Sequence, residues 1–145
     1  MFCLPRRAHP QQTKQFCIRD RATNTPLTTV IDYFHQPPGD ILTESPVFIG
    51  KADALVVVYA VDNRESFANV ENWVYFGERF STPLVRFIVG TKSDAATRAV
   101  EKAEAVALAK RLGTSYYEVS ARTGRNVDEF FGALTKLLMK ERVRG

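Results

Sequence analysis

The chain has 145 residues, of which 45% are hydrophobic and 25% are charged. These values are typical of one ordinary globular domain, and they exclude a disordered or fibrous chain. Basic and acidic residues alternate along the chain, so the net charge of +4 indicates solvated helix faces, and no nucleic-acid partner is expected.

Cysteine content and hydropathy indicate a cytoplasmic protein. Two cysteines, Cys3 and Cys17, are too few for a disulfide framework or a four-cysteine zinc site. No stretch approaches the roughly 20 apolar residues of a membrane span.

The first third of the chain predicts a lead-in, a hairpin and a loop. Residues 1–13 lack periodicity, so we expect an irregular lead-in before a domain at 14–145. Two strands follow, Lys14–Arg19 and Leu27–Tyr33, and the turn-forming residues between them indicate an antiparallel hairpin. Three prolines predict a loop over residues 35–47.

Strand-like and helix-like patterns then alternate, which predicts an α/β sheet with helices on both faces. Ala54–Val61 is continuously apolar, as in a strand buried on both faces. Helical spacing of apolar residues follows over 67–80. Further strands are expected at Leu84–Gly90 and Ser115–Val119, with a helix at Val100–Leu112 between them.

Two residues predict where helices end and begin in the last third of the chain. Gly113 stands where a helix commonly stops on a glycine. Asn126, with Glu129 three residues later, resembles the capping box that starts a helix, and apolar residues at helical spacing follow.

Polar loops follow two of the predicted strands. Thr91-Lys92-Ser93-Asp94 comes directly after Leu84–Gly90, and Ser120-Ala121-Arg122 follows Ser115–Val119. Open α/β sheets bind ligands at the carboxyl ends of their strands, so these loops form a candidate ligand site. An ordinary polar turn with a helix-starting aspartate would give the same Lys-Ser-Asp sequence.

The segment Val58–Trp73, together with these two loops, resembles Ras-superfamily small GTPases, most like the Rab branch. The first loop lies where that family has Asn/Thr-Lys-x-Asp, and Glu118–Arg122 lies where it has Glu-x-Ser-Ala-Lys or a variant. The similarity in element order extends from about Leu27 to the C-terminus. It implies a three-layer P-loop GTPase-like α/β domain that binds GTP or GDP with Mg²⁺.

The resemblance also implies roles for the loop residues. The Asp94 carboxylate would accept two hydrogen bonds from guanine that adenine cannot offer. The stem of Lys92 would lie along the base, Ser120 would brace the loop, and the Ala121 backbone N–H would donate to the base oxygen. The remaining positions expected to contact the nucleotide are Thr91 and Arg122.

The phosphate-binding half departs from the family pattern. The sequence has no Gly-x-x-x-x-Gly-Lys-Ser/Thr run. The best match to the family's Asp-x-x-Gly-Gln is Asp32-Tyr33-Phe34-His35-Gln36, in which Asp32 would reach Mg²⁺ through water and Gln36 would orient the attacking water. His35 replaces the glycine, and the alternative is that Asp32 and Gln36 are polar residues that close a strand.

The family's first strand, phosphate loop and first helix have no counterpart in the sequence. In the family that strand lies mid-sheet, between the strands matching Leu27–Tyr33 and Ala54–Val61. Each backbone group left buried and unpaired costs on the order of 1 to 3 kcal/mol. We therefore expect a sequence that begins part-way through the domain, or else direct pairing of the two flanking strands.

Two functions are compatible with these residues. The first is an active Rab-like GTPase that acts as a switch in trafficking or signalling, with effector and regulator proteins as partners. The second is a catalytically inactive pseudo-GTPase that serves as an interaction scaffold, which His35 and the two prolines after Gln36 favour. The last residues contain no cysteine, so no prenyl anchor is expected and any endomembrane association would be through partners.

Overall fold

The computed structural model describes residues 13–19, 26–32, 52–80 and 82–144. The chain divides into two compact units, Met1–Asp40 and Ile41–Gly145. The loop expected over residues 35–47, and Gln36 within it, lie outside the described residues.

The first unit contains the hairpin that the sequence predicts. Strands β1 (Thr13–Arg19) and β2 (Pro26–Asp32) pair antiparallel, with Thr13 opposite Asp32 and Arg19 opposite Pro26. Pro26 occupies the first position of β2, where the missing backbone N–H is tolerated. The following residues are rich in β-branched side chains, which favour extended backbone.

The second unit is built on a parallel sheet of β3 (Ala54–Ala60), β4 (Val85–Thr91) and β5 (Ser115–Glu118), in that order. Gly90 pairs with Tyr59 on one side and Glu118 on the other, so the three carboxyl ends meet at one edge. β2 lies in the first unit and β3 in the second, and the direct pairing considered for these two strands stays a prediction.

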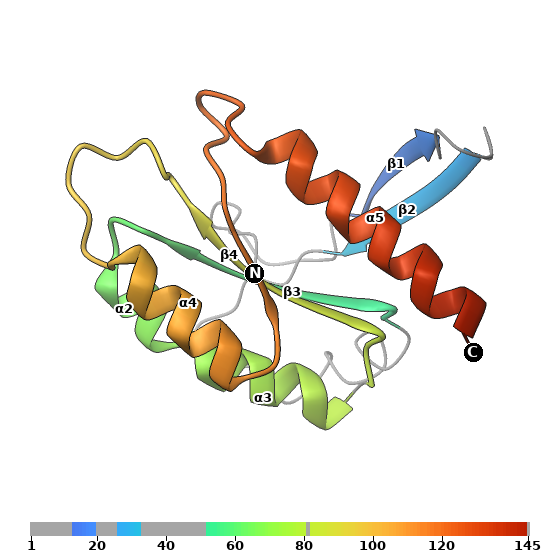
Figure 1. Cartoon of the computed structure of the whole chain (residues 1–145), viewed down its shortest axis with the longest axis horizontal. Coiled ribbons are helices and arrows are strands. Elements are labelled where there is room, and N and C mark those ends of the chain that lie inside the picture. The colour runs from blue at the N-terminus through green and yellow to red at the C-terminus, as the bar shows by residue number, and fades with distance from the viewer. Residues whose placement is uncertain (1–12, 20–25, 33–51, 81, 145) are drawn as a thin grey trace. The chain divides into compact units, whose positions relative to one another are not determined.

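Helices cover both faces of this sheet, which confirms the predicted three-layer arrangement. Figure 1 shows α2 (Arg64–Ala68), α3 (Val70–Phe80) and α4 (Lys102–Arg111) on one face and α5 (Val127–Arg144) on the other. The apolar spacing over residues 67–80 is shared between two helices, since α2 ends at its C-cap Asn69. No helix in the described part is long and apolar enough to cross a membrane.

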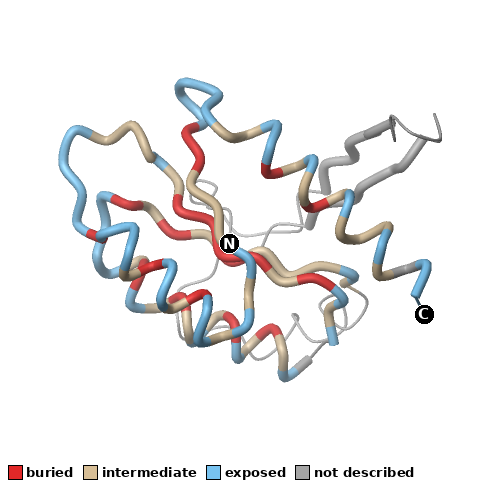
Figure 2. Tube along the Cα trace, viewed as in Figure 1, coloured by how far each residue is buried: buried red, intermediate tan, exposed pale blue. Residues whose placement is uncertain are grey.

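The core has two parts because β4, the central strand, is buried on both faces. Figure 2 shows the buried residues along the strands and on the helices. Val57 and Ile88 pack with the side chains of α2, α3 and α4, whereas Phe87 and Val89 pack with those of α5. The apolar run of β3 also contributes to both parts of the core, since Val57 and Tyr59 are buried in one part and Ala54, Val56 and Val58 pack partly buried against the other.

One predicted helix end is confirmed, and the predicted start of α5 is confirmed in position but not in its capping conformation. Gly113 has φ +63°, and hydrogen bonds from Gly113 and Thr114 N–H to the last turn of α4 form a Schellman stop. Asn126 has φ +59°, outside the extended conformation of an N-cap, and its side-chain amide donates to the Glu118 carbonyl at 2.9 Å. Asn126 therefore ties the start of α5 to β5.

Candidate functional site

The two polar loops meet at the carboxyl edge of the parallel sheet. Val61 N–H donates to the Thr91 carbonyl at 3.0 Å, and Val119 N–H donates to the Gly90 carbonyl at 2.8 Å. Ser93 N–H donates to the Val119 carbonyl at 3.1 Å, which joins the loop after β4 directly to the end of β5. The fold thus brings together residues that lie about thirty positions apart in the sequence.

Asp94 is held between a buried serine and an exposed arginine. Its Oδ1 accepts from the Ser120 hydroxyl at 2.5 Å, and its Oδ2 accepts from Arg122 Nε at 2.6 Å. Ser120 is completely buried and also accepts from the Thr123 backbone N–H at 3.1 Å. The Arg122 side chain is 77% exposed, against 19% for Asp94, so the arginine contacts the carboxylate from the solvent side.

These contacts keep Asp94 ionised. Donation from the Ser120 hydroxyl, with a further contribution from Arg122, lowers the pKa of Asp94 below its ordinary value of 3.8, although burial acts in the opposite direction. An ionised carboxylate is an acceptor only. At neutral pH Asp94 is therefore in the form that can receive two N–H donors from one edge of a planar base.

The first loop is also tied to the end of β3. The Thr91 hydroxyl donates to the Tyr59 carbonyl at 2.9 Å. Lys92 has φ +58°, and its Nζ lies 3.1 and 3.0 Å from the two carboxylate oxygens of Asp62. The side chain of Lys92 is still 61% exposed, so the ion pair leaves its stem at the surface of the site.

A hydrogen-bonded network lies beside the loops and joins all three strands. The Tyr59 and Tyr116 hydroxyls are 2.7 Å apart, and Tyr116 donates to Glu118 Oε1 at 2.7 Å. The Arg98 guanidinium donates to both oxygens of Glu118, at 3.1 and 2.6 Å. This network connects the segment after β4 to β5 and, through Tyr59, to β3.

The charge states within the network follow from its burial. Burial raises the pKa of the Tyr59 and Tyr116 hydroxyls, so both stay protonated at neutral pH. Burial is the strongest single influence on Glu118 and would raise its pKa, but hydrogen bonds from Arg98 and Tyr116, with the nearby positive charges of Arg98 and Lys102, together lower it. A Cβ on Gly90 would lie 2.9 Å from the Tyr59 hydroxyl, so the network fits only against a glycine.

The remaining predicted site residues are Ala121, Asp32 and Gln36. Ala121 is exposed in the second loop. Asp32 ends β2 in the other unit, and its side chain lies outside the described residues, as does all of Gln36. No group of three or more His, Cys, Asp or Glu side chains in the described part could hold a metal ion. The roles of Asp32 and Gln36 therefore stay predictions.

Sequence reasoning missed two contributors to the site and one contact. Asp62 pairs with Lys92, and Arg98 forms an ion pair with Glu118 that braces the loops. Arg122 was predicted as a site residue, but its contact with Asp94 was not. Asp62 gave the clearest signal, because it is an acidic residue placed directly after a buried parallel strand, where ligand sites form. The pairing of Arg98 with Glu118 depends on strand register and had no local signal.

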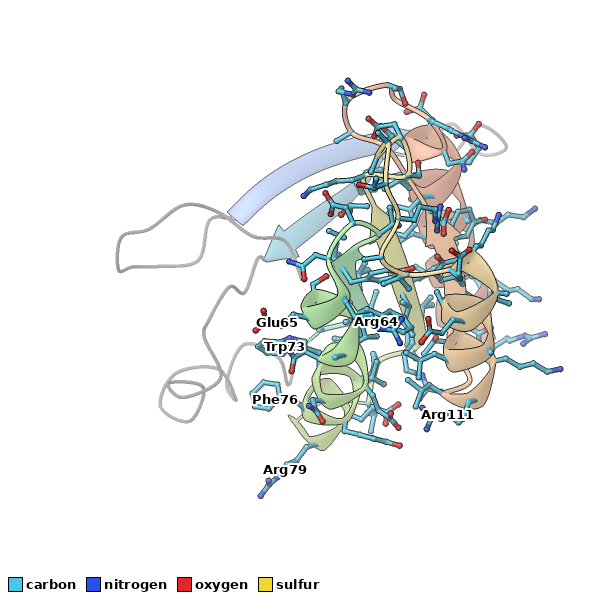
Figure 3. All side chains as sticks on the ribbon, turned by 90° about the vertical axis from the view of Figure 1, so that its left-hand side faces the viewer. Arg64, Glu65, Trp73, Phe76, Arg79 and Arg111 are labelled. Carbon is cyan, nitrogen blue, oxygen red and sulfur yellow. The ribbon has the colours of Figure 1, made fainter. Side chains whose placement is uncertain are left out.

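A separate cavity of 420 Å³ lies between α2–α3 and α4, and none of the loop residues line it. Arg64 forms a bidentate ion pair with Glu104, and Arg111 forms one with Glu71. Figure 3 labels the two arginines on these helices. Both pairs bridge the two helical segments, so this cavity is a feature of helix packing.

Comparisons with known proteins agree with the fold and with the loops. The model of the Ras family matches residues 42–140. Ras-related protein Rab-13 of Canis lupus familiaris is 36% identical over 92 residues, which are 61% of this chain. The aligned region is 45% of that relative, so the chain spans less than half the length of the curated protein it matches. The match and the sheet together bear out the predicted GTPase-like α/β fold.

Proposed function

Because the chain belongs to the Ras family, and is a Rab-like member of it, we propose that it binds GTP and GDP and hydrolyses GTP as a molecular switch in intracellular trafficking or signalling. We further propose that it acts in the cytoplasm, or at endomembranes through partner proteins. Effectors and regulators would recognise surfaces that nucleotide binding orders.

The observation that carries this proposal is the Asp94 carboxylate at the joined loop ends. It lies after β4, is bonded to the buried Ser120 that follows β5, and is ionised at neutral pH. Guanine offers two adjacent N–H donors where adenine does not, so a site built on this carboxylate discriminates strongly between the two bases.

The neighbouring residues suit a planar base bound on Asp94. The Ala121 backbone N–H would donate to the base oxygen, and the exposed stem of Lys92 would cover one face of the base. Thr91 holds the first loop against β3, and Arg122 flanks the carboxylate. Asp94, Lys92 and Ala121 would bind and orient the base, and none of the loop residues would perform chemistry on phosphate.

The phosphate half of the proposed site rests on the family resemblance. Mg²⁺, when bound, would neutralise charge on the phosphates. Asp32 is the residue proposed to reach it through water, and Gln36 the residue proposed to orient the attacking water. No described cluster fits a metal ion, so no step of the reaction is derived through it.

The proposal is tested by titrating the purified chain with a fluorescent GDP analogue, with and without Mg²⁺. We expect saturable binding that unlabelled GDP displaces and ADP does not. Absence of binding at tens of micromolar protein would contradict nucleotide binding by this chain.

A matched variant tests the role of Asp94. Asp94→Asn replaces an acceptor by an amide that presents a donor to the guanine edge, so we expect weaker GDP binding and new binding of the xanthine analogue. Binding of both nucleotides unchanged from the wild type would remove Asp94 from base recognition.

The second candidate is a pseudo-GTPase that serves as a protein-interaction scaffold. Both carboxylate oxygens of Asp94 are already bonded within the chain, so the loops are satisfied by protein contacts alone. Absence of saturable GDP binding in the titration would favour such a scaffold over the switch.

A further inference from the structure

Arg122 contacts the Asp94 carboxylate on the side that a ligand would approach. Ser120 is completely buried and bonds to Oδ1 from inside the domain. Arg122 donates Nε–H to Oδ2 at 2.6 Å, from a side chain that is 77% exposed. The Arg122 guanidinium therefore lies against Oδ2 on its exposed side, where a base that bonds to this oxygen would meet it.

We propose that Arg122 competes with the guanine base for Asp94 and so lowers the affinity of this chain for guanine nucleotides. The proposal rests on the proposed function, and names Arg122 as a residue that sets base specificity. Guanine needs both carboxylate oxygens for its two N–H donors. Arg122 already donates to one of them and partly offsets the negative charge that attracts those donors.

The competition is selective, because it acts only on bases that use Asp94. Adenine offers no pair of N–H donors to this carboxylate, so adenine would gain no such hydrogen bonds if Arg122 were displaced. Arg122 therefore weakens the preference for guanine over adenine, whereas a residue that merely shaped the loop would affect both bases alike.

The size of the effect follows from the exposure of the pair. Ion pairs at exposed positions are weak, so we expect displacement of Arg122 to change guanine affinity by about two- to five-fold. Salt screens exposed charges, so the effect should shrink as ionic strength rises.

The test compares the full chain carrying Arg122→Gln with the wild type, using fluorescent GDP and ADP analogues at low and high salt. Arg125→Gln is the matched control, because Arg125 is an exposed arginine of the same loop and its substitution removes the same charge. The hydrogen bonds to Asp94 come from Ser120 and Arg122, which this control leaves unchanged. We expect Arg122→Gln to bind GDP two- to five-fold more tightly at low salt, with a smaller gain at high salt. ADP binding should not change, and Arg125→Gln should match the wild type.

Each other outcome has a definite meaning. GDP binding by Arg122→Gln that equals or falls below that of a binding-competent wild type overturns the competition and leaves the proposed function standing. An equal gain in Arg125→Gln also overturns it, since loop charge would then be the cause. GDP binding by Arg122→Gln, with none detected for the wild type or Arg125→Gln, supports the competition. Binding by none of the proteins overturns the proposed function, and this inference with it.

Discussion

At the scale of single residues, Asp94 shows how two contacts set a charge state. The Ser120 hydroxyl, aided by Arg122, lowers its pKa although the site is partly shielded from water. The residue type could be identified in the sequence from its place after a predicted strand. Its contact with Arg122 could not be predicted, because that contact depends on how the second loop turns after Ser120.

The lowered pKa of Asp94 predicts how stability responds to acid. Because this pKa is lower in the folded than in the unfolded chain, the charge favours folding above the unfolded value, and the contribution is lost as pH falls through the folded value. Below pH 3.8 we expect the free energy of unfolding to fall more steeply for the wild type than for Asp94→Asn. Urea denaturation at a series of pH values measures both slopes, and equal slopes would contradict the prediction.

At the scale of elements, the network of Tyr59, Tyr116, Glu118 and Arg98 holds the strand ends at a fixed separation. Periodicity predicted the strands that carry it, because buried parallel strands are continuously apolar. It could not predict the network, since a tyrosine within such a run looks like any other apolar residue. Only the register that places Gly90 between Tyr59 and Glu118 brings the polar groups together.

Removing a hydroxyl from this network should destabilise the chain. Tyr59 is 2% exposed and its hydroxyl bonds to Tyr116, so we expect Tyr59→Phe to lower the free energy of unfolding by about 1 kcal/mol. Tyr75→Phe is the matched control, because that hydroxyl donates to Glu71 from a residue 54% exposed, and a change within about 0.5 kcal/mol is expected. Urea denaturation measures the free energy of unfolding of both variants. Equal losses would contradict a stabilising role for the network.

At the scale of the whole molecule, the sequence predicted the hairpin, the parallel sheet and the helices on both faces. Each of these follows from local periodicity and turn chemistry, which act over a few residues. The order β3-β4-β5 within the parallel sheet does not follow from local patterns, because sheet order is decided by long-range pairing. The left-handed Asn126 was missed for a similar reason, since its side chain bonds to the distant Glu118.

Ligand binding should stabilise the chain as a whole, and with base selectivity. A ligand that binds only the folded state at 100 times its Kd adds about 2.7 kcal/mol. For a chain of this length that corresponds to a rise in Tm of about 5 to 10 °C. We expect GDP to produce such a rise in a thermal unfolding experiment and ADP at the same concentration to produce almost none, because Asp94 is offered paired N–H donors only by guanine. Equal shifts would show that stabilisation comes from the phosphates, and would leave base recognition by the two loops without support.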